Sequence, residues 1–257
     1  MATAILMPAY NETTALVRTL EALAALADRA ESADGLPESR ARACSRANLH
    51  GSLRGTTVFL VDDGSDVPIE LDALPRAIRV VLARHPFNLG QGAALETARQ
   101  LALATHDLTF DAYVTMDADG QHRVEDVVAL AAAIRGGADV AFGNRFRGDS
   151  NVPPTRRWLL RAARVFESAV TGLHLADAHN GLRAFSRRAL EQVPIRQNRM
   201  AHATEIKQRV SRAGALAVVE VPVSVRYTRE SLAKGQTSLG ALVIVRDLLL
   251  QYLFGEP

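Results

Sequence analysis

The sequence predicts one α/β domain built on a mostly parallel central sheet that is flanked by helices. Its 257 residues fit the size of a single α/β unit. Hydrophobic residues make up 48% and charged residues 23%, which is close to the average of globular proteins and allows a substantial core. Up to residue 145, short apolar runs alternate with longer helical patterns, as in parallel sheets joined by right-handed crossovers.

The expected elements follow one another in a regular order. We expect strands at residues 4–7, 57–61, 78–82, 112–116 and 139–142. We expect helices at residues 16–27, 92–105 and 124–135. This Rossmann-like alternation predicts that residues 1–145 form a nucleotide-binding half of the domain.

The rest of the chain departs from this alternation. Residues 28–55 are polar, Arg-rich and longer than a normal connection, so we expect an exposed insertion there. Beyond residue 145 we expect Arg-rich helices and loops at 156–171, a short segment at 180–185, a helix at 202–213 and a strand at 217–225. We assign residues 146–238 to a second half of the same domain. Residues 239–257 are expected to form an amphipathic helix that rests on a bilayer or on a second copy of the chain.

The composition argues against several classes of protein. The net charge is +2, but the basic residues are spread along the chain and aromatic residues make up only 5%, so a nucleic-acid-binding protein is not expected. The lone Cys44 excludes an internal disulfide and a cysteine-based zinc site. We expect neither a signal peptide nor a membrane span, since no apolar run reaches about 18 residues. A cytoplasmic protein is expected, with contact to the inner face of the plasma membrane as an open alternative.

Polar clusters follow four of the expected strands. They are residues 8–12 (PAYNE), 62–65 (DDGS), 117–122 (DADGQH) and 143–145 (GNR). Each cluster alone has an ordinary interpretation, because Asn11 or Thr13 can cap a helix and residues 63–64 are typical of a turn. In open α/β sheets, however, ligands bind beyond the carboxyl ends of the strands. Four such clusters at one edge therefore predict a binding site.

The residue types in these clusters suit a nucleotide and a divalent cation. Asp119 offers the hard oxygen that Mg²⁺ or Mn²⁺ prefers, Gln121 a second oxygen and His122 an imidazole. A cation there would neutralise the charge of a departing nucleoside diphosphate. Asp63 and Glu12 can accept hydrogen bonds from a base or a ribose. Tyr10 can stack beside the base, and Arg145 can bind phosphate or a leaving group.

Four segments in this order resemble the signature of glycosyltransferase family 2, most closely the polyprenyl- or dolichyl-phosphate sugar transferases. They are residues 8–12, 61–65, 88–92 and 117–122, and the resemblance extends over most of the chain outside residues 28–55. It implies a GT-A fold and inverting transfer of a sugar from a nucleotide-sugar with the help of a divalent metal. By position, it implies that Asp119 and Gln121 bind the metal. It also implies donor contacts by Pro8, Tyr10, Glu12, Asp63, Asp117, Ala118 and Arg145.

The resemblance extends to an acceptor side in the second half of the chain. Residues 180–185 resemble the family's segment under the acceptor, with Asp177 just upstream, although His179 and Asn180 replace a common Thr-Ser pair. Glu205 is expected to be a general base, an orienter of one, or only a carboxylate at a helix start, and Asp177 is the competing base. A lipid phosphate acceptor would need no base, because its oxygen is already anionic.

Two glycine-containing segments complete the predicted site. In residues 88–93 the glycines allow either a tight start of a helix or a close approach to a ligand. Residues 225–238 carry cations and small residues, and are expected to close over the diphosphate as a lid. The subgroup has Gly-x-Ser-Lys there, whereas this chain places its lysine earlier, so we assign the cationic role to Lys234 and Arg229 and a donor contact to Gln236.

The predicted function is metal-dependent, inverting transfer of a sugar from a UDP-, GDP- or dTDP-sugar to a polyprenyl phosphate or a glycan in cell-envelope glycoconjugate synthesis. Asp177, Glu205, Arg145 and Lys234 are the predicted catalytic residues. Four arginines either meet phosphate or a membrane surface or form a solvated helix face: Arg156, Arg157, Arg161 and Arg164. A sugar-1-phosphate nucleotidyltransferase is the first alternative, but residues 8–12 lack its Gly-rich basic loop. A non-catalytic nucleotide-sugar-binding protein is the second, although the metal ligands are present.

Overall fold

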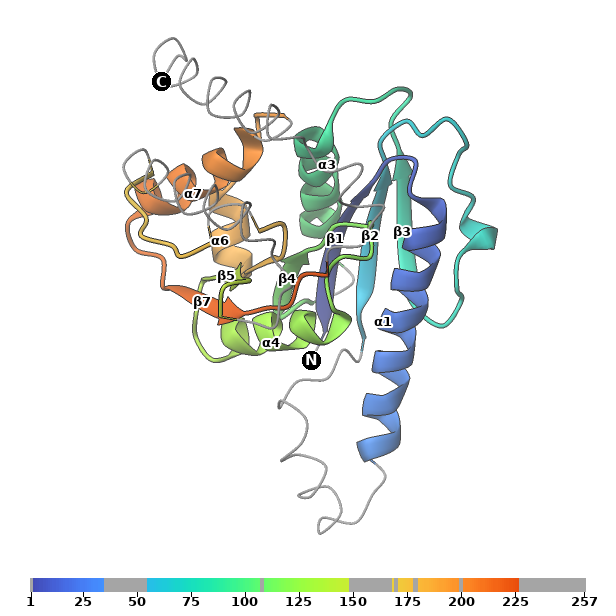
Figure 1. The fold of residues 1–257 in the computed structure, drawn as a ribbon, viewed down its shortest axis with the longest axis horizontal. Coiled ribbons are helices and arrows are strands. Elements are labelled where there is room, and N and C mark those ends of the chain that lie inside the picture. Colours follow the sequence, from blue (N-terminus) through green and yellow to red (C-terminus); the bar gives the residue numbers. More distant parts are fainter. Residues whose placement is uncertain are drawn as a thin grey trace.

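The computed structural model describes residues 2–34, 55–106, 109–147, 168, 171–177, 180–198 and 201–226. These residues form a seven-stranded sheet with helices on both faces (Figure 1). In the first half of the chain the elements are β1 (Thr3–Ala9), α1 (Thr13–Asp34), β2 (Thr57–Asp62), η1 (Leu71–Ala73), β3 (Arg79–Arg84), α3 (Gln91–Ala104), β4 (Ala112–Thr115), α4 (Val124–Arg135) and β5 (Val140–Asn144). The second half adds β6 (Arg183–Phe185), α6 (Arg187–Gln192), α7 (Ala201–Ala213) and β7 (Val218–Pro222).

The strands run in the order β3-β2-β1-β4-β6-β5-β7. The pairs β3–β2, β2–β1 and β1–β4 are parallel, which confirms the predicted parallel pairing of the first half. The short strand β6 lies antiparallel between β4 and β5, while β5 pairs in parallel with β7. Strands β1, β2, β4 and β5 therefore point the same way, and their carboxyl ends share one edge of the sheet as predicted.

Both faces of the sheet are covered, which explains why the strands read as continuous apolar runs rather than as alternating ones. Ile5, Met7 and Leu60 belong to a core cluster with residues of α1 and α4. Leu6 and Phe59 belong to a second cluster on the other face, with residues of α3, α6 and α7. All seven residues of β1 are buried. The sheet is thus the middle of three layers (Figure 1).

The crossovers do not all have the predicted right hand. Helix α1 leads from β1 toward β2, whereas α4 leads from β4 in the opposite direction toward β5, yet both helices lie on the same face. Two such crossovers must have opposite hands. The apolar side chains of α4, among them Val127, Leu130 and Ile134, join the core under α1, so packing decides the face on which α4 lies.

Two predicted boundaries are also wrong. Helix α1 continues to Asp34, seven residues past its expected end at Ala27, so the first part of the expected insertion is helical. Residues 28–34 consist largely of Ala, Arg, Glu and Asp, which favour or tolerate a helix without giving it an apolar stripe. Strand β7 ends at Pro222 rather than at Val225, which instead forms an isolated bridge with His122.

Several predicted features lie outside the described residues. They are most of the insertion (35–54), the arginines of residues 156–164, the lid beyond Arg226 and the C-terminal helix. Among the helices that are described, none is long and apolar enough to cross a membrane.

Candidate functional site

The loops after β1 and β2 are bonded to each other at the carboxyl edge of the sheet. The amide of Asp63 donates to the Ala9 carbonyl oxygen at 2.8 Å, and the amide of Asn11 donates to Ser65 Oγ at 3.0 Å. The side chain of Asn11 exchanges two further hydrogen bonds of 3.0 Å with Asp66. Asn11 therefore joins the two loops, and the prediction that it caps a helix is wrong.

The two neighbouring aspartates after β2 have different roles. Asp62 is fully buried, and its carboxylate accepts from the amides of Ser65 at 2.9 Å and Ile69 at 3.2 Å. Burial raises its pKa, but these bonds and the charge of Arg84 outweigh that effect and lower the pKa below the usual carboxyl range. Asp62 thus holds the loop in shape.

Asp63, which is predicted to contact the nucleotide-sugar donor, lies where the loops after β2 and β3 meet the start of α3. Its Oδ1 accepts from His85 Nδ1 at 2.7 Å and from the Leu89 amide at 3.0 Å, while its Oδ2 accepts from the Gly90 amide at 2.8 Å. Gly64 has φ +72°, and a Cβ there would lie 2.3 Å from the Phe87 carbonyl carbon. Only glycine allows this close approach of the loops after β2 and β3.

Asp117 follows β4 and is held from three sides. Its Oδ1 accepts from Gln91 Nε2 at 2.7 Å, and its Oδ2 lies 3.5 Å from His122 Nε2. A Cβ on Gly181 would lie 2.2 Å from the same Oδ2, so any side chain at this position would displace the Asp117 carboxylate. Burial raises the pKa of Asp117, but the hydrogen bond and charge of His122, with the charges of Arg183 and His202, lower it overall. Asp117 is therefore an ionised carboxylate that still has 28% of its side chain exposed.

Asp119 and Gln121, the predicted metal ligands, lie side by side. Asp119 Oδ1 accepts from the Gln121 amide at 3.0 Å, and its Oδ2 accepts from Gln121 Nε2 at 2.5 Å. Burial and the negative charges of Asp117 and Glu12 raise the pKa of Asp119. A cation would relieve this repulsion, and a half-turn of the Gln121 amide would bring its oxygen toward the same point.

This pair fits a cation that takes few ligands from the protein. Within the described part of the chain, no group of three His, Cys, Asp or Glu side chains is close enough to hold a metal ion. Mg²⁺ commonly uses one or two carboxylates and completes its shell with water and substrate phosphates. Asp119 and Gln121 suit that type of site.

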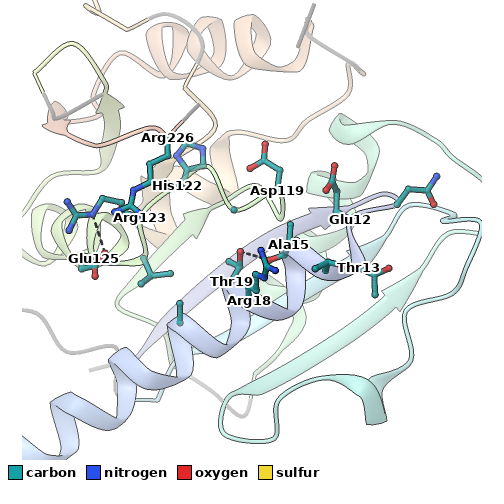
Figure 2. Close-up of a pocket in the computed structure, with 15 residues that line it drawn as sticks. Glu12, Thr13, Ala15, Arg18, Thr19, Asp119, His122, Arg123, Glu125 and Arg226 are labelled. Atoms are coloured by element: carbon teal, nitrogen blue, oxygen red, sulfur yellow. Dashed lines mark hydrogen bonds and ion pairs between the residues drawn. The ribbon is translucent and has the colours of Figure 1, made fainter. Parts of the chain in front are cut away.

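A cleft of about 710 Å³ opens beside Asp119, between α1 and the start of α4. Figure 2 shows Glu12 and Asp119 at one end of it, above the first turn of α1, with Arg123 and Arg226 toward the other end. Arg18 and several threonines of α1 line the floor. The cleft thus carries carboxylates next to the candidate metal site, while its far end carries Arg226 and the ion pair of Arg123 with Glu125.

The predicted catalytic residues Arg145 and Asp177 are bonded to each other. Asp177 Oδ2 accepts from Arg145 Nε at 2.6 Å, from the Arg145 amide at 2.9 Å and from Asn180 Nδ2 at 3.3 Å. The side chain of Arg145 is 7% exposed and that of Asp177 is fully buried. These contacts favour a role for Asp177 in positioning Arg145 over a role as general base.

Glu205, unlike Asp177, has a complete set of partners, since Asp177 Oδ1 is buried without a hydrogen bond to any described residue. It lies beyond the first turn of α7, so the interpretation as a helix-start carboxylate is wrong. Its Oε2 accepts from the amides of Arg196 at 2.9 Å and Gln197 at 2.8 Å, and its Oε1 accepts two bonds from Arg209. A carboxylate has about four acceptor positions, and all four are used. The geometry favours the orienting alternative.

The other predicted site residues take various positions. Pro8 and Ala118 are buried, the latter to 3% exposure, and contribute backbone to the edge. Tyr10 is 44% exposed and free to stack. Lys234, Arg229 and Gln236 lie outside the described residues. The described chain that precedes them ends at Arg226, whose amide donates to the Gln121 carbonyl oxygen at 2.9 Å.

Sequence reasoning missed several residues of the site. Gln91 belongs to a segment that was expected to start a helix or to meet a ligand; it does start α3, and its side chain also reaches Asp117. Nothing in the sequence around His85 or His202 indicates a site residue, because neither belongs to the four polar clusters that follow the predicted strands. Only contacts between distant segments place them here.

Comparisons with known proteins agree with this geometry. A model of the family described as "Glycosyl transferase family 2" matches residues 4–193. The chain is 28% identical over 180 residues to the UDP-N-acetylglucosamine–dolichyl-phosphate N-acetylglucosaminyltransferase of Methanococcus voltae, covering 67% of this chain and 70% of that protein. It is also 28% identical over 201 residues to the polyprenol monophosphomannose synthase of Mycolicibacterium smegmatis, covering 74% and 73%.

Solved structures support the fold. Glucosyl-3-phosphoglycerate synthase of Mycobacterium tuberculosis superposes with a TM-score of 0.62 at 20% identity, covering 100% of this chain and 81% of that one. The same enzyme in complex with Mn²⁺ and UDP-glucose also gives a TM-score of 0.62, at 19% identity and with coverage of 100% and 80%. The predicted GT-A fold is therefore confirmed. With the family match over residues 4–193, this chain belongs to glycosyl transferase family 2 and is a glycosyltransferase.

Proposed function

We propose that this enzyme transfers a sugar, with inversion and with the help of a divalent cation, from a nucleoside diphosphate sugar to a polyprenyl phosphate. The observation that carries the donor side is the group of carboxylates at the strand edge. Asp119 is half-buried beside Asp117 and Glu12, and burial together with the negative charges of these two residues raises its pKa, although His122 and the Gln121 amide act in the opposite direction. Such a site favours a bound cation and, through it, a diphosphate.

The residues around this edge have separate tasks in the proposed reaction. Asp119 and Gln121 would hold the cation, which neutralises charge on the departing nucleoside diphosphate. Gln91 and His122 fix the Asp117 carboxylate toward the donor. The exposed ring of Tyr10 is available to stack on the base. Arg145, held by Asp177, presents a cation on the side where the acceptor would approach.

The state of the two predicted bases supports a phosphate acceptor. A neutral hydroxyl needs a general base to remove its proton, whereas a phosphate oxygen is already anionic. Both Asp177 and Glu205 are buried and bonded to arginine. Asp177 Oδ1 has no hydrogen-bond partner among the described residues, but it is itself buried, so neither residue offers a basic oxygen at the surface of the site. The named activities of the two relatives, which act on dolichyl phosphate and make a polyprenol phosphate sugar, support the same acceptor class.

The donor and metal are tested with the intact chain. Thermal stability and calorimetric binding are measured with UDP-, GDP- and dTDP-sugars, each with Mn²⁺, with Mg²⁺ and with a chelator. We expect one nucleotide family to stabilise the protein only when a divalent cation is present. If no nucleotide binds in a metal-dependent way, the proposal fails.

The acceptor is tested by transfer of a radiolabelled sugar from the donor found in that panel. Polyprenyl phosphate in detergent is compared with the matching polyprenol, which has a hydroxyl instead of the phosphate, and with a neutral oligosaccharide. We expect product only with the phosphate. Transfer to the oligosaccharide alone would reject the lipid-phosphate acceptor and leave the donor assignment intact.

A further inference from the structure

His85 is bonded to Asp63, which is one of the proposed donor contacts. His85 follows β3 and is 8% exposed. Its Nδ1 lies 2.7 Å from Asp63 Oδ1, and its Nε2 lies 2.9 Å from Oγ1 of Thr97, in the second turn of α3. The imidazole therefore connects the Asp63 carboxylate to helix α3, which packs on the face of the sheet opposite to α1 and α4.

The direction of the hydrogen bonds follows from the donors and acceptors. An ionised carboxylate only accepts hydrogen bonds, so Nδ1 of His85 is the protonated nitrogen and donates to Asp63. In the neutral ring Nε2 is then the acceptor, and the Thr97 hydroxyl donates to it. Thr97, His85 and Asp63 form a chain with one fixed tautomer.

Asp63 keeps one acceptor position for a ligand. A carboxylate has about four such positions, and three are used by His85, the Leu89 amide and the Gly90 amide. The remaining one is on Oδ2, and the side chain is 4% exposed. Such a small opening suits a single directional hydrogen bond from an N–H or O–H group, not a solvated ion.

We propose that His85 is the positioning residue that aims the last free lone pair of Asp63 at the donor's nucleobase, and that it thereby sets the preference for a base with a ring N–H. This inference rests on the proposed function, because it assumes that the donor base lies at this edge. Uracil, thymine and guanine carry such an N–H, whereas the N3 atom of cytosine is an acceptor. Without the Nδ1–H bond, only the amides of Leu89 and Gly90 hold the carboxylate, so its orientation is less firmly fixed and the preference weakens.

Two variants separate the two ends of the ring. His85→Asn places an amide N–H near the position of Nδ1 and loses the contact with Thr97. His85→Gln places its amide near the position of Nε2 and loses the contact with Asp63. His106→Gln is the matched control, because His106 is exposed in the turn after α3. Thr97→Val removes only the outer bond.

Calorimetry gives the Kd of each variant for UDP, dTDP, GDP and CDP with Mn²⁺, and heating gives its Tm. A hydrogen bond to a charged group corresponds to about a tenfold to hundredfold change in affinity. We expect His85→Gln to weaken the preferred nucleotide by about tenfold while CDP changes little, so that the ratio of the two Kd values falls. We expect His85→Asn and Thr97→Val to stay within about threefold of the wild type, as His106→Gln does.

The outcomes distinguish the inference from the proposed function. If the wild type binds no nucleotide, the proposed function fails and this inference with it. If the wild type prefers UDP, dTDP or GDP over CDP and His85→Gln keeps that ratio while only its Tm falls, His85 is merely structural and the inference alone is overturned. A wild type that binds CDP equally well also overturns it. Should His85→Gln not fold, the double variant His85→Asn with Thr97→Val is required to keep the ratio, and its loss rejects the assignment to Nδ1.

Discussion

The carboxylates at the two ends of the site differ in how their charge is balanced. On the proposed donor side, Asp119 has a raised pKa and lies near two other carboxylates, and among the described residues only the Gln121 side chain and amide are bonded to it. On the proposed acceptor side, Asp177 and Glu205 are each bonded to an arginine and to one or two backbone amides. The same residue type therefore serves two purposes. Clustered negative charge is typical of a cation-binding site, and charge that is paired with arginine is typical of a structural or positioning role.

The largest expected effect is on the unbalanced side. Asp119→Asn keeps the shape of the side chain and removes the charge that a cation needs. Because a metal contributes several kcal/mol to stabilising a leaving group, we expect activity to fall by roughly a thousandfold. Metal-dependent nucleotide binding should be lost in the same calorimetric titration, while Tm without metal stays equal or rises. Unchanged affinity would place the metal elsewhere and remove the contrast between the two sides.

The next effect concerns the buried pair on the balanced side. Asp177→Asn leaves Arg145 buried without its counter-charge, and breaking a buried pair costs about 3–5 kcal/mol. We expect denaturant unfolding to show a loss in that range. Glu191→Gln is the control, because it removes the surface ion pair between Arg187 and Glu191. Their side chains are 46% and 52% exposed, and exposed ion pairs contribute less than about 1 kcal/mol to stability. Full stability of Asp177→Asn with strongly reduced activity would make Asp177 a base after all.

A smaller effect is expected at Glu205. Glu205→Gln turns one acceptor oxygen into a donor, and it loses the charge that two Arg209 nitrogens share. We expect a loss of about 1–3 kcal/mol in the free energy of unfolding and a kcat within about tenfold of the wild type. A general base would behave in the opposite way, with stability retained and kcat lowered by about a hundredfold or more. Measuring both quantities on one preparation decides between these roles.

The smallest effect is the pH dependence of the metal-free protein. Burial and the negative charges of Asp117 and Glu12 raise the pKa of Asp119 in the folded protein. The stability that the protonated Asp119 contributes is therefore fully present below the pKa of a free carboxyl group, about 4, and is lost as the pH rises through the raised pKa. The difference in Tm between wild type and Asp119→Asn should therefore shift in favour of the wild type as the pH is lowered. With Mn²⁺ the sign reverses, because metal binding requires the ionised carboxylate. An unchanged difference across this range would show that Asp119 has an ordinary environment.

Much of the fold was predictable because its signals are local. Continuous apolar runs such as residues 4–7 and 57–61 identified strands that are buried on both faces, and alternation with helices gave their parallel order. The direction of β6 was not predictable, since a three-residue strand carries no directional pattern. The full length of α1 was missed because residues 28–34 favour a helix by composition without an apolar stripe.

The sequence by itself determined that four polar clusters follow parallel strands and so meet at one edge, because strand direction and residue order are enough for that conclusion. Only the tertiary structure decided which carboxylates there keep free oxygen atoms. Arg145, which binds Asp177, and Gln91, which binds Asp117, lie 32 and 26 residues away in the sequence, and no local pattern predicts these two contacts. Burial and charge balance depend on such contacts between distant segments. These two properties distinguish an aspartate in a candidate metal site from an aspartate in a buried ion pair.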